Sequence, residues 1–271
     1  MTVLVTGGTG LVGSRLLPRL IEAGIDCRAL VRAGKELPAG VRSVEGDILD
    51  PASLGRAVSG ITAVIHLAAV LRTPNTDEIW KVNLEGTRNL IAALKANAPE
   101  ARFIMASTGL VYNADTKRPS REDDATEPKM PYPASKVASE NELRASGLNW
   151  SIQRFGFVYG DKDEHINMVP RLAGMFKWHP ANKLSMIHHR DIATAMNLAL
   201  TGAMDGRIVN IVDEAPTSIY ELSEIAGEMV APSSEPLPNP WFGHLDGSLA
   251  HSLGFAPLVR TVYQAAQEGA L

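Results

Sequence analysis

The sequence predicts an α/β fold in which helices cover both faces of a parallel sheet. Two observations support this prediction. Short runs of Val, Ile, Leu and Ala alternate with longer segments of helical period over the first 160 residues, and such alternation is typical of parallel strands joined by right-handed crossover helices. In addition, Val64–Ala69 is almost continuously apolar, which indicates a central strand buried on both faces.

Each strand is predicted where a short apolar run is bounded by polar or turn residues. In chain order, the predicted strands are Val3–Thr6, Cys27–Val31, Arg42–Glu45, Ala63–Leu67, Arg102–Ala106, Trp150–Phe155 and Gly206–Val212. The segments between and after them repeat apolar residues with the period of a helix. The predicted helices are Gly10–Ala23, Pro51–Val58, Asp77–Asn97, Pro133–Ala145, Asn167–Lys177 and Arg190–Leu200.

The alternation loosens after residue 112, where residues 113–131 are polar and contain prolines. We expect them to form a surface loop, with a solvated REDDATE stretch that could close over a substrate. The predicted domains follow from the same pattern. We expect a sheet domain of residues 1–160, to which 187–213 return, and a small irregular lobe of residues 161–186 and 214–271.

Composition limits the kinds of partner. The 271 residues carry a net charge of -4, which gives no basic footprint for nucleic acid. No apolar run is long enough to span a bilayer, and the N-terminus lacks the pattern of a signal peptide. The single cysteine, Cys27, excludes an internal disulfide and favours a reducing compartment. We therefore expect a cytoplasmic protein that binds neither nucleic acid nor membrane.

A glycine-rich turn follows the first strand directly. Glycines at this place let the backbone approach a pyrophosphate, whose charge is favoured by the N-terminus of the next helix. A phosphate loop for ATP would need a Lys-Ser or Lys-Thr pair where this chain has Gly13-Ser14. The sequence therefore predicts a Rossmann-type dinucleotide site. Its predicted turn residues are Gly7, Gly10, Leu11, Val12 and Gly13.

The tip of the second strand bears on the choice of dinucleotide. An acidic residue there would bind the ribose 2′-hydroxyl of NAD, whereas an arginine would accommodate the 2′-phosphate of NADP. The strand ends at Val31 and is followed by Arg32, while Asp26 lies at its other end. The sequence therefore favours NADP(H) over NAD(H).

Tyr132 and Lys136 lie four residues apart on a predicted helix, so their side chains share one face. An adjacent ammonium is expected to lower the pKa of the phenol, which could then exchange a proton with an alcohol or ketone. Ser107 and Thr108 follow the fifth strand, and ligands of parallel sheets bind outside the carboxyl ends of the strands. We expect Thr108 to bind the substrate oxygen, with Ser107 beside it.

Together these motifs resemble the extended short-chain dehydrogenases/reductases, which include sugar-nucleotide epimerases and dehydratases. The resemblance covers nearly the whole chain. Besides the glycine turn, it rests on GDILD (46–50), HLAA (66–69), NLEGT (83–87), STGLVY (107–112), PYPASK (131–136), RFGFVYG (154–160), HHRDIATA (188–195) and LGFAP (253–257).

The resemblance implies roles for particular residues. Tyr132 would be the catalytic acid or base, Lys136 would also bind the nicotinamide ribose, and Thr108 would orient the substrate oxygen. Two helices, 77–97 and 133–145, would form a homodimer interface. Further residues implied at the cofactor are Asp47 and Ile48 at the adenine, Leu67, Ala68 and Ala69 along the cofactor, the structural Asn83, and Phe155 near the nicotinamide.

Departures from the family pattern narrow the reaction. Gly109 and Leu110 stand where the sugar dehydratases place an Asp-Glu pair, so dehydration has no evident acid and base. Asn167, in NMVP, resembles a residue that contacts the nucleotide in the epimerases. The arginine that would grip a diphosphate is missing, and Lys183 is the candidate substitute.

Three functions remain open at this point. The favoured one is an NAD(P)-dependent oxidoreductase that acts on a carbonyl or hydroxyl carbon of a small molecule. The second is a nucleotide-sugar epimerase that recycles tightly bound NAD, and the third is a non-catalytic NADP(H) sensor. No metal site is predicted, because the adjacent His188 and His189 point apart and no Cys or carboxylate spacing completes a ligand set.

Overall fold

Parallel strands form the centre of the computed structural model, which describes residues 1–113 and 115–271. Residue 114, inside the predicted loop 113–131, lies outside the described residues. In this part of the chain a seven-stranded sheet has the order β10-β6-β5-β4-β1-β2-β3, with every neighbouring pair parallel. Its strands are β1 (Thr2–Thr6), β2 (Asp26–Val31), β3 (Arg42–Glu45), β4 (Ala63–His66), β5 (Arg102–Thr108), β6 (Trp150–Phe155) and β10 (Arg207–Ile211).

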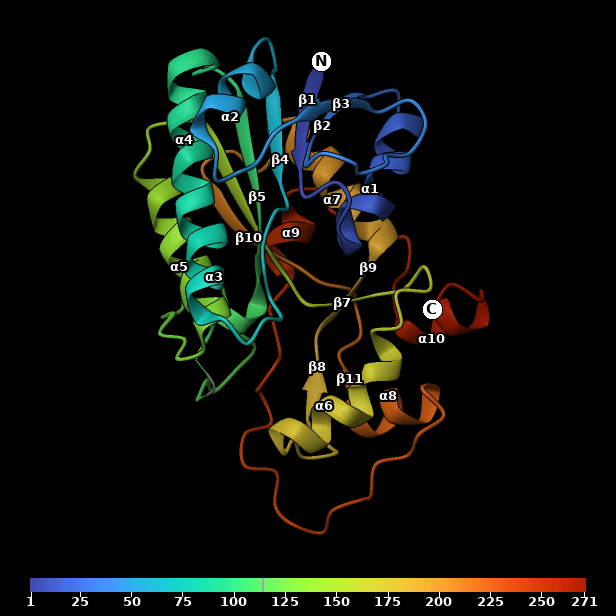
Figure 1. Cartoon of the computed structure of the whole chain (residues 1–271). Coiled ribbons are helices and arrows are strands. Elements are labelled where there is room, and N and C mark those ends of the chain that lie inside the picture. The colour runs from blue at the N-terminus through green and yellow to red at the C-terminus, as the bar shows by residue number, and fades with distance from the viewer. Residues whose placement is uncertain (114) are drawn as a thin grey trace.

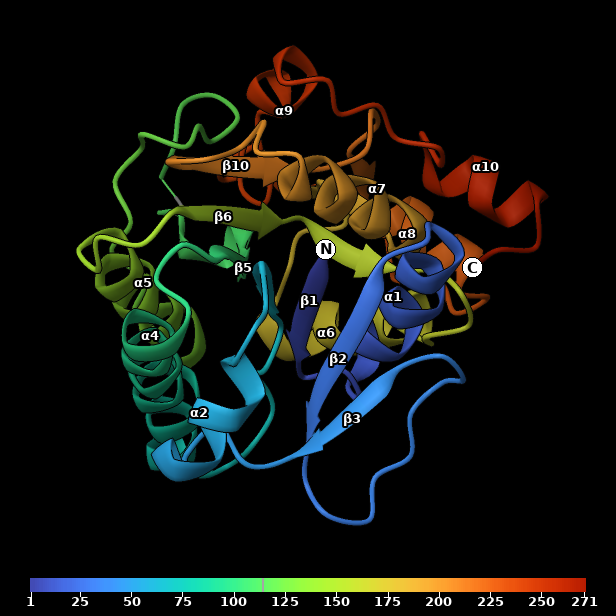
Figure 2. The same ribbon diagram turned by 90° about the horizontal axis from the view of Figure 1, so that it is seen from above.

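Helices cover both faces of this sheet, which confirms the predicted doubly wound α/β class (Figures 1 and 2). One face carries α1 (Leu11–Glu22) and α7 (His189–Leu200), and the other carries α2 (Pro51–Val58), α4 (Gly86–Asn97) and α5 (Pro131–Arg144). The side chains beneath each layer form a separate apolar core. Burying both faces explains why the strands are apolar at nearly every position.

The single helix predicted at 77–97 consists of three pieces. These are α3 (Thr76–Trp80), a π-helical turn (Lys81–Glu85) and α4. The carbonyl oxygen of Asn83, within the π turn, accepts hydrogen bonds from Thr87 Oγ1 and Ser139 Oγ at 2.5 and 2.8 Å. Ser139 belongs to α5, so the widened turn connects two helices beside the sheet edge. Such π turns often occur at functional sites.

The second part of the chain builds a smaller layer below the carboxyl edge of the sheet (Figure 1). Its own apolar core is formed largely by side chains of three helices and the strands beside them. Ala250 and Phe255 instead belong to the core shared with α1 and α7, so part of the predicted lobe packs on the sheet domain. The elements are β7 (Phe157–Tyr159), the 3-10 turn Ile166–Met168, α6 (Val169–Phe176), β8 (Lys183–Leu184), β9 (Met186–His188), β11 (Thr217–Ser218), α8 (Ile219–Ile225), α9 (Ser248–Ser252) and α10 (Val262–Gln267).

The loop after β5 is held more firmly than a solvated surface loop. Ser120 is buried and exchanges backbone hydrogen bonds with the strand-like segment 244–246. The carboxylate of Glu122, within the REDDATE stretch, accepts the backbone N–H of Asn210 at 2.8 Å. The REDDATE stretch, residues 121–127, alternates exposed and half-buried residues. It therefore presents the expected solvated face while Ser120 and Glu122 anchor it at the end of β10.

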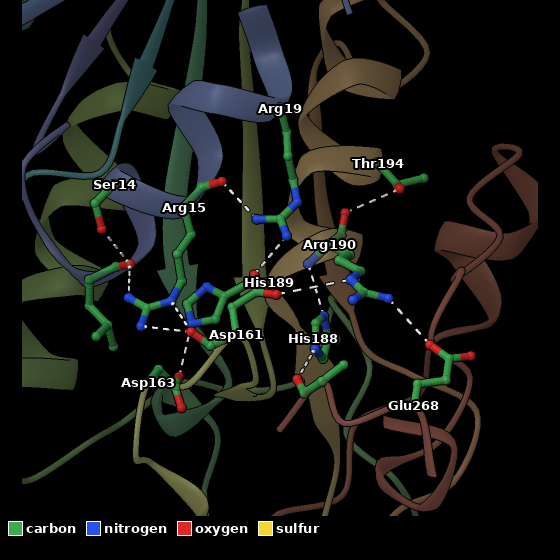
Figure 3. A network of polar contacts seen from close by, with 12 residues as sticks. Ser14, Arg15, Arg19, Asp161, Asp163, His188, His189, Arg190, Thr194 and Glu268 are labelled. Atoms are coloured by element: carbon green, nitrogen blue, oxygen red, sulfur yellow. Dashed lines mark hydrogen bonds and ion pairs between the residues drawn. The ribbon is translucent and has the colours of Figure 1, made fainter. Parts of the chain in front are cut away.

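A polar network joins α1, α7 and the segment after β7 (Figure 3). The backbone carbonyl of Asp161 accepts from the Arg15 guanidinium at 3.0 and 3.1 Å, and its carboxylate lies 2.8 Å from Arg19. Arg190 of α7 lies 3.3 Å from the carboxylate of Glu268. Asp161 also has a left-handed backbone, with φ of 51°. The network thus fixes a strained turn between the two helices of one face.

No helix in the described part of the chain is long and apolar enough to cross a membrane.

Candidate active site

The turn between β1 and α1 has the geometry that a pyrophosphate requires. Gly7 has φ of 73°, and a Cβ there would lie 2.7 Å from the backbone nitrogen of Ala68. A Cβ on Gly13 would lie 2.2 Å from the carbonyl oxygen of Gly7, whereas Gly10 faces open space except for one contact at 3.2 Å. No side chain caps α1, so the N–H groups of its first turn, including those of Leu11 and Val12, remain available for an anion.

Arg32 follows the tip of β2 and is exposed. Its guanidinium makes no hydrogen bond or ion pair with any described residue. Asp26 begins the same strand and binds Thr2 and Arg42 there, both through Oδ2. The free cation is therefore at the end of β2 that lies beside the glycine turn, while the acidic group is at the far end.

The loop after β4 lies against the glycine turn and is held by Asn83. The Asn83 amide oxygen accepts the Val70 N–H at 2.7 Å, and its nitrogen donates to Val70 O and Ser135 Oγ at 3.0 and 2.9 Å. The segment Leu67–Ala69 is thereby placed between the glycine turn and α5. Asn83 is 1% exposed and has both amide donors in use, so it supports this loop as a clamp.

The segment GDILD forms the turn after β3. Asp47 Oδ1 accepts the Leu49 N–H at 2.8 Å, which stabilises the turn. Ile48 is buried against α4, where a Cβ on Gly86 would lie 2.9 Å from the Ile48 side chain. This turn follows the strand that neighbours β2, so its backbone can form one wall for an adenine.

Thr108 ends β5 and begins a short 3-10 turn, Gly109–Val111. Its Oγ1 accepts the Leu110 N–H at 3.2 Å, which leaves the hydroxyl proton free to donate to another oxygen. Gly109 lies against Leu245, and a Cβ there would lie 2.6 Å from Leu245 Cδ1, so a larger residue would have to displace this side chain. The position that holds an acid in the dehydratases is thus filled by an apolar contact.

Tyr132 and Lys136 lie on the first turns of α5. The Tyr132 phenol is half-buried and has no hydrogen-bond partner among the described residues. Burial raises its pKa to about 12, and no lowering by Lys136 opposes it. The lowered pKa expected from Lys136 was therefore wrong for the chain by itself.

Lys136 is 3% exposed and, like Tyr132, lacks a hydrogen-bond partner among the described residues. Burial lowers its pKa to about 8, against the opposing charge of Glu140. An ammonium on a largely buried side chain is favoured when a ligand supplies oxygen atoms as hydrogen-bond acceptors. Together with the open glycine turn, Lys136 therefore fits a nicotinamide dinucleotide with ribose hydroxyls at this end.

The hydroxyls of Ser107 and Thr108 have different environments. Ser107 is 5% exposed and donates its hydroxyl to Glu140, which forms an ion pair with Arg154 at 2.6 Å. The predicted substrate role of Ser107 conflicts with this contact, because its only donor is already used inside the protein. Neither Glu140 nor Arg154 was identified from the sequence. The spacing of Glu140 four residues after Lys136 was the available signal.

The remaining predicted residues are spread around the site. Phe155, at the end of β6, is buried in the core with α1 and α7. Asn167 is exposed in the 3-10 turn before α6, and Lys183 is exposed on β8. Arg72, in the loop after β4, reaches Met168 Sδ at 3.5 Å, so the loop beside the cofactor turn contacts the element that carries Asn167.

Comparison with known proteins shows the family of this chain. Residues 3–212 match the model of the NAD dependent epimerase/dehydratase family. The chain belongs to this family, within the extended short-chain dehydrogenases/reductases, whose members are NAD(P)-dependent epimerases, dehydratases and dehydrogenases. The predicted fold class and resemblance are thus confirmed.

Individual relatives differ in what they act on. The chain is 36% identical over 173 residues to a UDP-glucose 4-epimerase of Azospirillum brasilense, covering 58% of this chain and about half (49%) of that protein. It is 30% identical over 239 residues to a 4-hydroxy-2-methyl-3-oxo-4-farnesyl-3,4-dihydroquinoline-1-oxide ketoreductase of Stigmatella aurantiaca, covering 81% and 70%. An Agrobacterium tumefaciens short-chain dehydrogenase/reductase solved with bound NAD shares the fold, with a TM-score of 0.81, 22% identity and coverage of 99% and 95%.

Proposed function

We propose that this chain is an NADP(H)-dependent oxidoreductase that interconverts a ketone and a secondary alcohol on an apolar substrate. The observation that carries the proposal is that Thr108 ends β5, against which α5 packs with Tyr132 and Lys136 in its first turns. When bound, the nicotinamide gives a hydride to the carbonyl carbon or takes one from the alcohol carbon.

The chain's own groups handle the oxygen and its proton. In the reducing direction, Tyr132 Oη gives its proton to the substrate oxygen as negative charge develops there. The free hydroxyl proton of Thr108 donates a hydrogen bond to the same oxygen, since its lone pair already serves Leu110 N. Lys136, as an ammonium, stabilises the phenolate that Tyr132 leaves behind.

Arg32 supports the preference for NADP(H). Its exposed guanidinium has no partner among the described residues. The tip of β2 also lacks an acidic residue, which would repel a phosphate. A guanidinium binds a phosphate through two parallel charge-assisted hydrogen bonds. We therefore assign the adenosine 2′-phosphate of NADP(H) to Arg32.

Large apolar side chains near the catalytic residues support an apolar substrate. Leu110 and Met130 are each 48% exposed, and Leu71 is 44% exposed. Leu110 lies two residues after Thr108, and Met130 lies two residues before Tyr132. Leu71 follows Val70, which is hydrogen-bonded to Asn83, and Asn83 is in turn hydrogen-bonded to α5. Exposed apolar side chains at these sequence positions support an apolar binding surface beside the catalytic residues.

The candidate handle for a diphosphate is weak by comparison. Lys183 carries a single ammonium on a flexible side chain, and this charge already interacts with Glu221. Burial raises the pKa of Glu221, but hydrogen bonds from Ser218 and the charge of Lys183 lower it. The farnesyl-bearing substrate named for the Stigmatella relative is consistent with an apolar site. The Azospirillum relative favours the second candidate, a nucleotide-sugar epimerase, together with the exposed Asn167.

The test begins with the cofactor of the purified protein. We expect an empty site that binds NADPH more tightly than NADH by fluorescence titration. Oxidation of NADPH would then be followed with trans-1-decalone and, separately, interconversion of UDP-glucose and UDP-galactose without added reductant. Reduction of the ketone supports the proposal, whereas co-purified NAD with sugar interconversion would establish the epimerase instead.

Variants separate the apolar site from catalysis. We expect Tyr132→Phe to bind NADPH normally and to lose about 10²- to 10⁴-fold in turnover. Unchanged turnover would remove Tyr132 from catalysis, and a wild type that binds NADPH without any turnover would favour the sensor. Leu110→Gln and Met130→Gln should raise KM for trans-1-decalone with little change in NADPH affinity. Leu258→Gln is the matched control, since Leu258 is 65% exposed on a segment bound to Asp191 of α7. An equal rise in KM for all three glutamine variants would contradict an apolar substrate site at Leu110 and Met130.

We also propose a homodimer that pairs α4 and α5 with the same helices of a second copy. These helices lie side by side on the outer surface of one layer (Figure 1), joined by an ion pair of 2.6 Å between Arg88 and Glu142. Light scattering coupled to gel filtration tests the dimer, which a monomer mass would contradict. The predicted cytoplasmic location and the predicted domain boundaries stay predictions.

A further inference from the structure

Three buried polar side chains are in contact near the carboxyl end of β5. Ser107, Glu140 and Arg154 are 5%, 2% and 3% exposed and come from β5, α5 and β6. Ser107 and Arg154 are direct neighbours in the register of β5 and β6. Glu140 lies over both: one carboxylate oxygen accepts from Ser107 Oγ and from Arg154 Nε at 3.2 Å, and the other accepts from Arg154 Nη2 at 2.6 Å.

Each member of this cluster is adjacent to a residue of the proposed chemistry. Ser107 directly precedes Thr108, so its hydrogen bond fixes the end of the strand that presents the Thr108 hydroxyl. Glu140 lies one helical turn after Lys136 on α5, and residues four apart on a helix are neighbours. The cluster therefore holds the catalytic strand end and the catalytic helix in one arrangement.

The charge of Glu140 also acts on Lys136. Lys136 is buried without a hydrogen-bond partner among the described residues, which disfavours its ammonium form. Burial lowers the pKa of Lys136, and Glu140 opposes this effect. Without the carboxylate, a larger fraction of Lys136 would be neutral at physiological pH.

Arg154 holds Glu140 in place. Besides its two bonds to Glu140, its guanidinium donates to the carbonyl of Glu122 at 3.3 Å and lies 4.8 Å from the centre of the Tyr112 ring. Tyr112 Oη donates in turn to Asn210 Oδ1 at 2.7 Å. These contacts reach β10 and the loop after β5, so the carboxylate is fixed from several elements.

We propose that Glu140 is a positioning residue that keeps Lys136 charged and aligns it with Thr108 through the cluster with Ser107 and Arg154. The inference rests on the proposed function only for the use of Lys136 and Thr108 in catalysis. The state of Lys136 itself is measurable without any substrate. Failure of the two proposals is therefore distinguishable.

The experiment titrates Lys136 in the whole chain. Enzyme labelled with ¹³C at lysine Cε is followed by two-dimensional NMR as pH rises, and Lys136→Met assigns the signal. In Glu140→Gln, the midpoint of the Lys136 titration should move to lower pH by one unit or more. Glu142→Gln is the matched control on the same helix, since Glu142 contacts Arg88 at the surface. An unmoved midpoint in folded Glu140→Gln would overturn the proposal.

A second variant covers the case in which Glu140→Gln does not fold. Glu140→Met with Arg154→Met replaces the buried ion pair by apolar side chains, an exchange that proteins often tolerate. It should fold and still lower the pKa of Lys136, since Glu140, and not Arg154, is the charge that raises this pKa. In contrast, Glu140→Asp should return the midpoint toward that of the wild type. A double variant with a wild-type midpoint would also overturn the proposal.

Where wild-type turnover is measurable, the rate gives a further readout. The high-pH limb of kcat/KM for ketone reduction should move to lower pH in Glu140→Gln together with the Lys136 midpoint. A purely structural role would lower the rate equally at every pH. If the wild type has no turnover but the midpoint moves, the positioning proposal stands and the proposed function fails.

Discussion

The hydroxyl of Thr6 lies 2.7 Å from Nδ1 of His66, at the ends of two neighbouring strands. The direction of this bond follows from its surroundings. Thr87 donates its proton to Asn83 O and therefore accepts from His66 Nε2–H at 3.0 Å. Nδ1 is left as an acceptor for the Thr6 hydroxyl, whose oxygen receives the Ala68 N–H at 3.3 Å. A neutral histidine thus connects the cofactor loop to the π turn.

This arrangement predicts a pH dependence of stability. Burial lowers the pKa of His66 to about 3, with a smaller contribution from Lys136. The unfolded chain binds a proton at His66 below about pH 6.5 while the folded chain does not, so stability falls as pH drops from about 6.5 to about 3. We expect a loss of about 2 kcal/mol between pH 7 and pH 5 from this residue.

Urea unfolding of the wild type and of His66→Gln checks this expectation. The variant should be less stable at pH 7 but should lose less stability on acidification. The other buried histidines are present in both proteins and cancel in the comparison. Parallel stability curves for the two proteins would show that His66 is not the titrating group.

Gly7 and Gly24 are glycines for different physical reasons. Both have left-handed backbones, with φ of 73° and 75°, but a Cβ on Gly24 meets nothing within 4 Å whereas one on Gly7 meets the backbone of Ala68. Each alanine variant should lose about 1 kcal/mol or more in backbone strain. Only Gly7→Ala should also lose NADPH affinity, by about tenfold or more, since 1.4 kcal/mol of misfit suffices. Fluorescence titration beside urea unfolding measures both effects, and equal affinities would contradict the contact.

Arg32 gives a prediction about cofactor choice. Arg32→Ala should weaken NADPH binding by about ten- to hundredfold, the value of a charge-assisted hydrogen bond to phosphate, and should leave NADH binding unchanged. Its stability should change by less than about 0.5 kcal/mol, because the side chain is exposed. Arg56→Ala, on the exposed side of α2, controls for loss of a positive charge alone. A similar loss for both cofactors would place the 2′-phosphate elsewhere.

Thr108 combines a structural and a chemical role, and two substitutions distinguish them. Thr108→Val removes the acceptor for Leu110 N and the free donor, so it should cost about 1 kcal/mol of stability and about 10²-fold or more in kcat. Thr108→Ser keeps both groups and should retain most activity and stability. Steady-state kinetics with thermal unfolding tests this pair; a fully active valine variant would remove Thr108 from the mechanism.

Much of the fold was predictable because its determinants are local. The strands follow from short apolar runs, and the turn at Gly7–Gly13 follows from residue types that only a close backbone contact explains. The order of strands in a parallel sheet also restricts where ligands bind, which is why Thr108 and Tyr132 could be associated from sequence.

The features that the sequence did not reveal depend mostly on contacts between distant segments. The π turn depends on Ser139, more than fifty residues from Asn83, and the firmly held loop depends on Asn210, about ninety residues from Ser120. Neither partner is visible in a local pattern. The pKa of Tyr132 was predicted in the wrong direction because its sign depends on burial, and Ser107 and Thr108 are chemically alike in sequence but bind different partners.

The pairing of α1 with α7 has a consequence for synthesis. Leu16, Leu17 and Leu20 of α1 share one apolar core with Met196 of α7, yet about 170 residues separate the two helices in the chain. A ribosome therefore releases the glycine turn and α1 long before α7, which shields α1, has been made. The apolar face of α1 is therefore among the last surfaces of the molecule to be covered. Until α7 has been made, the leucines of α1 are exposed and can bind chaperones.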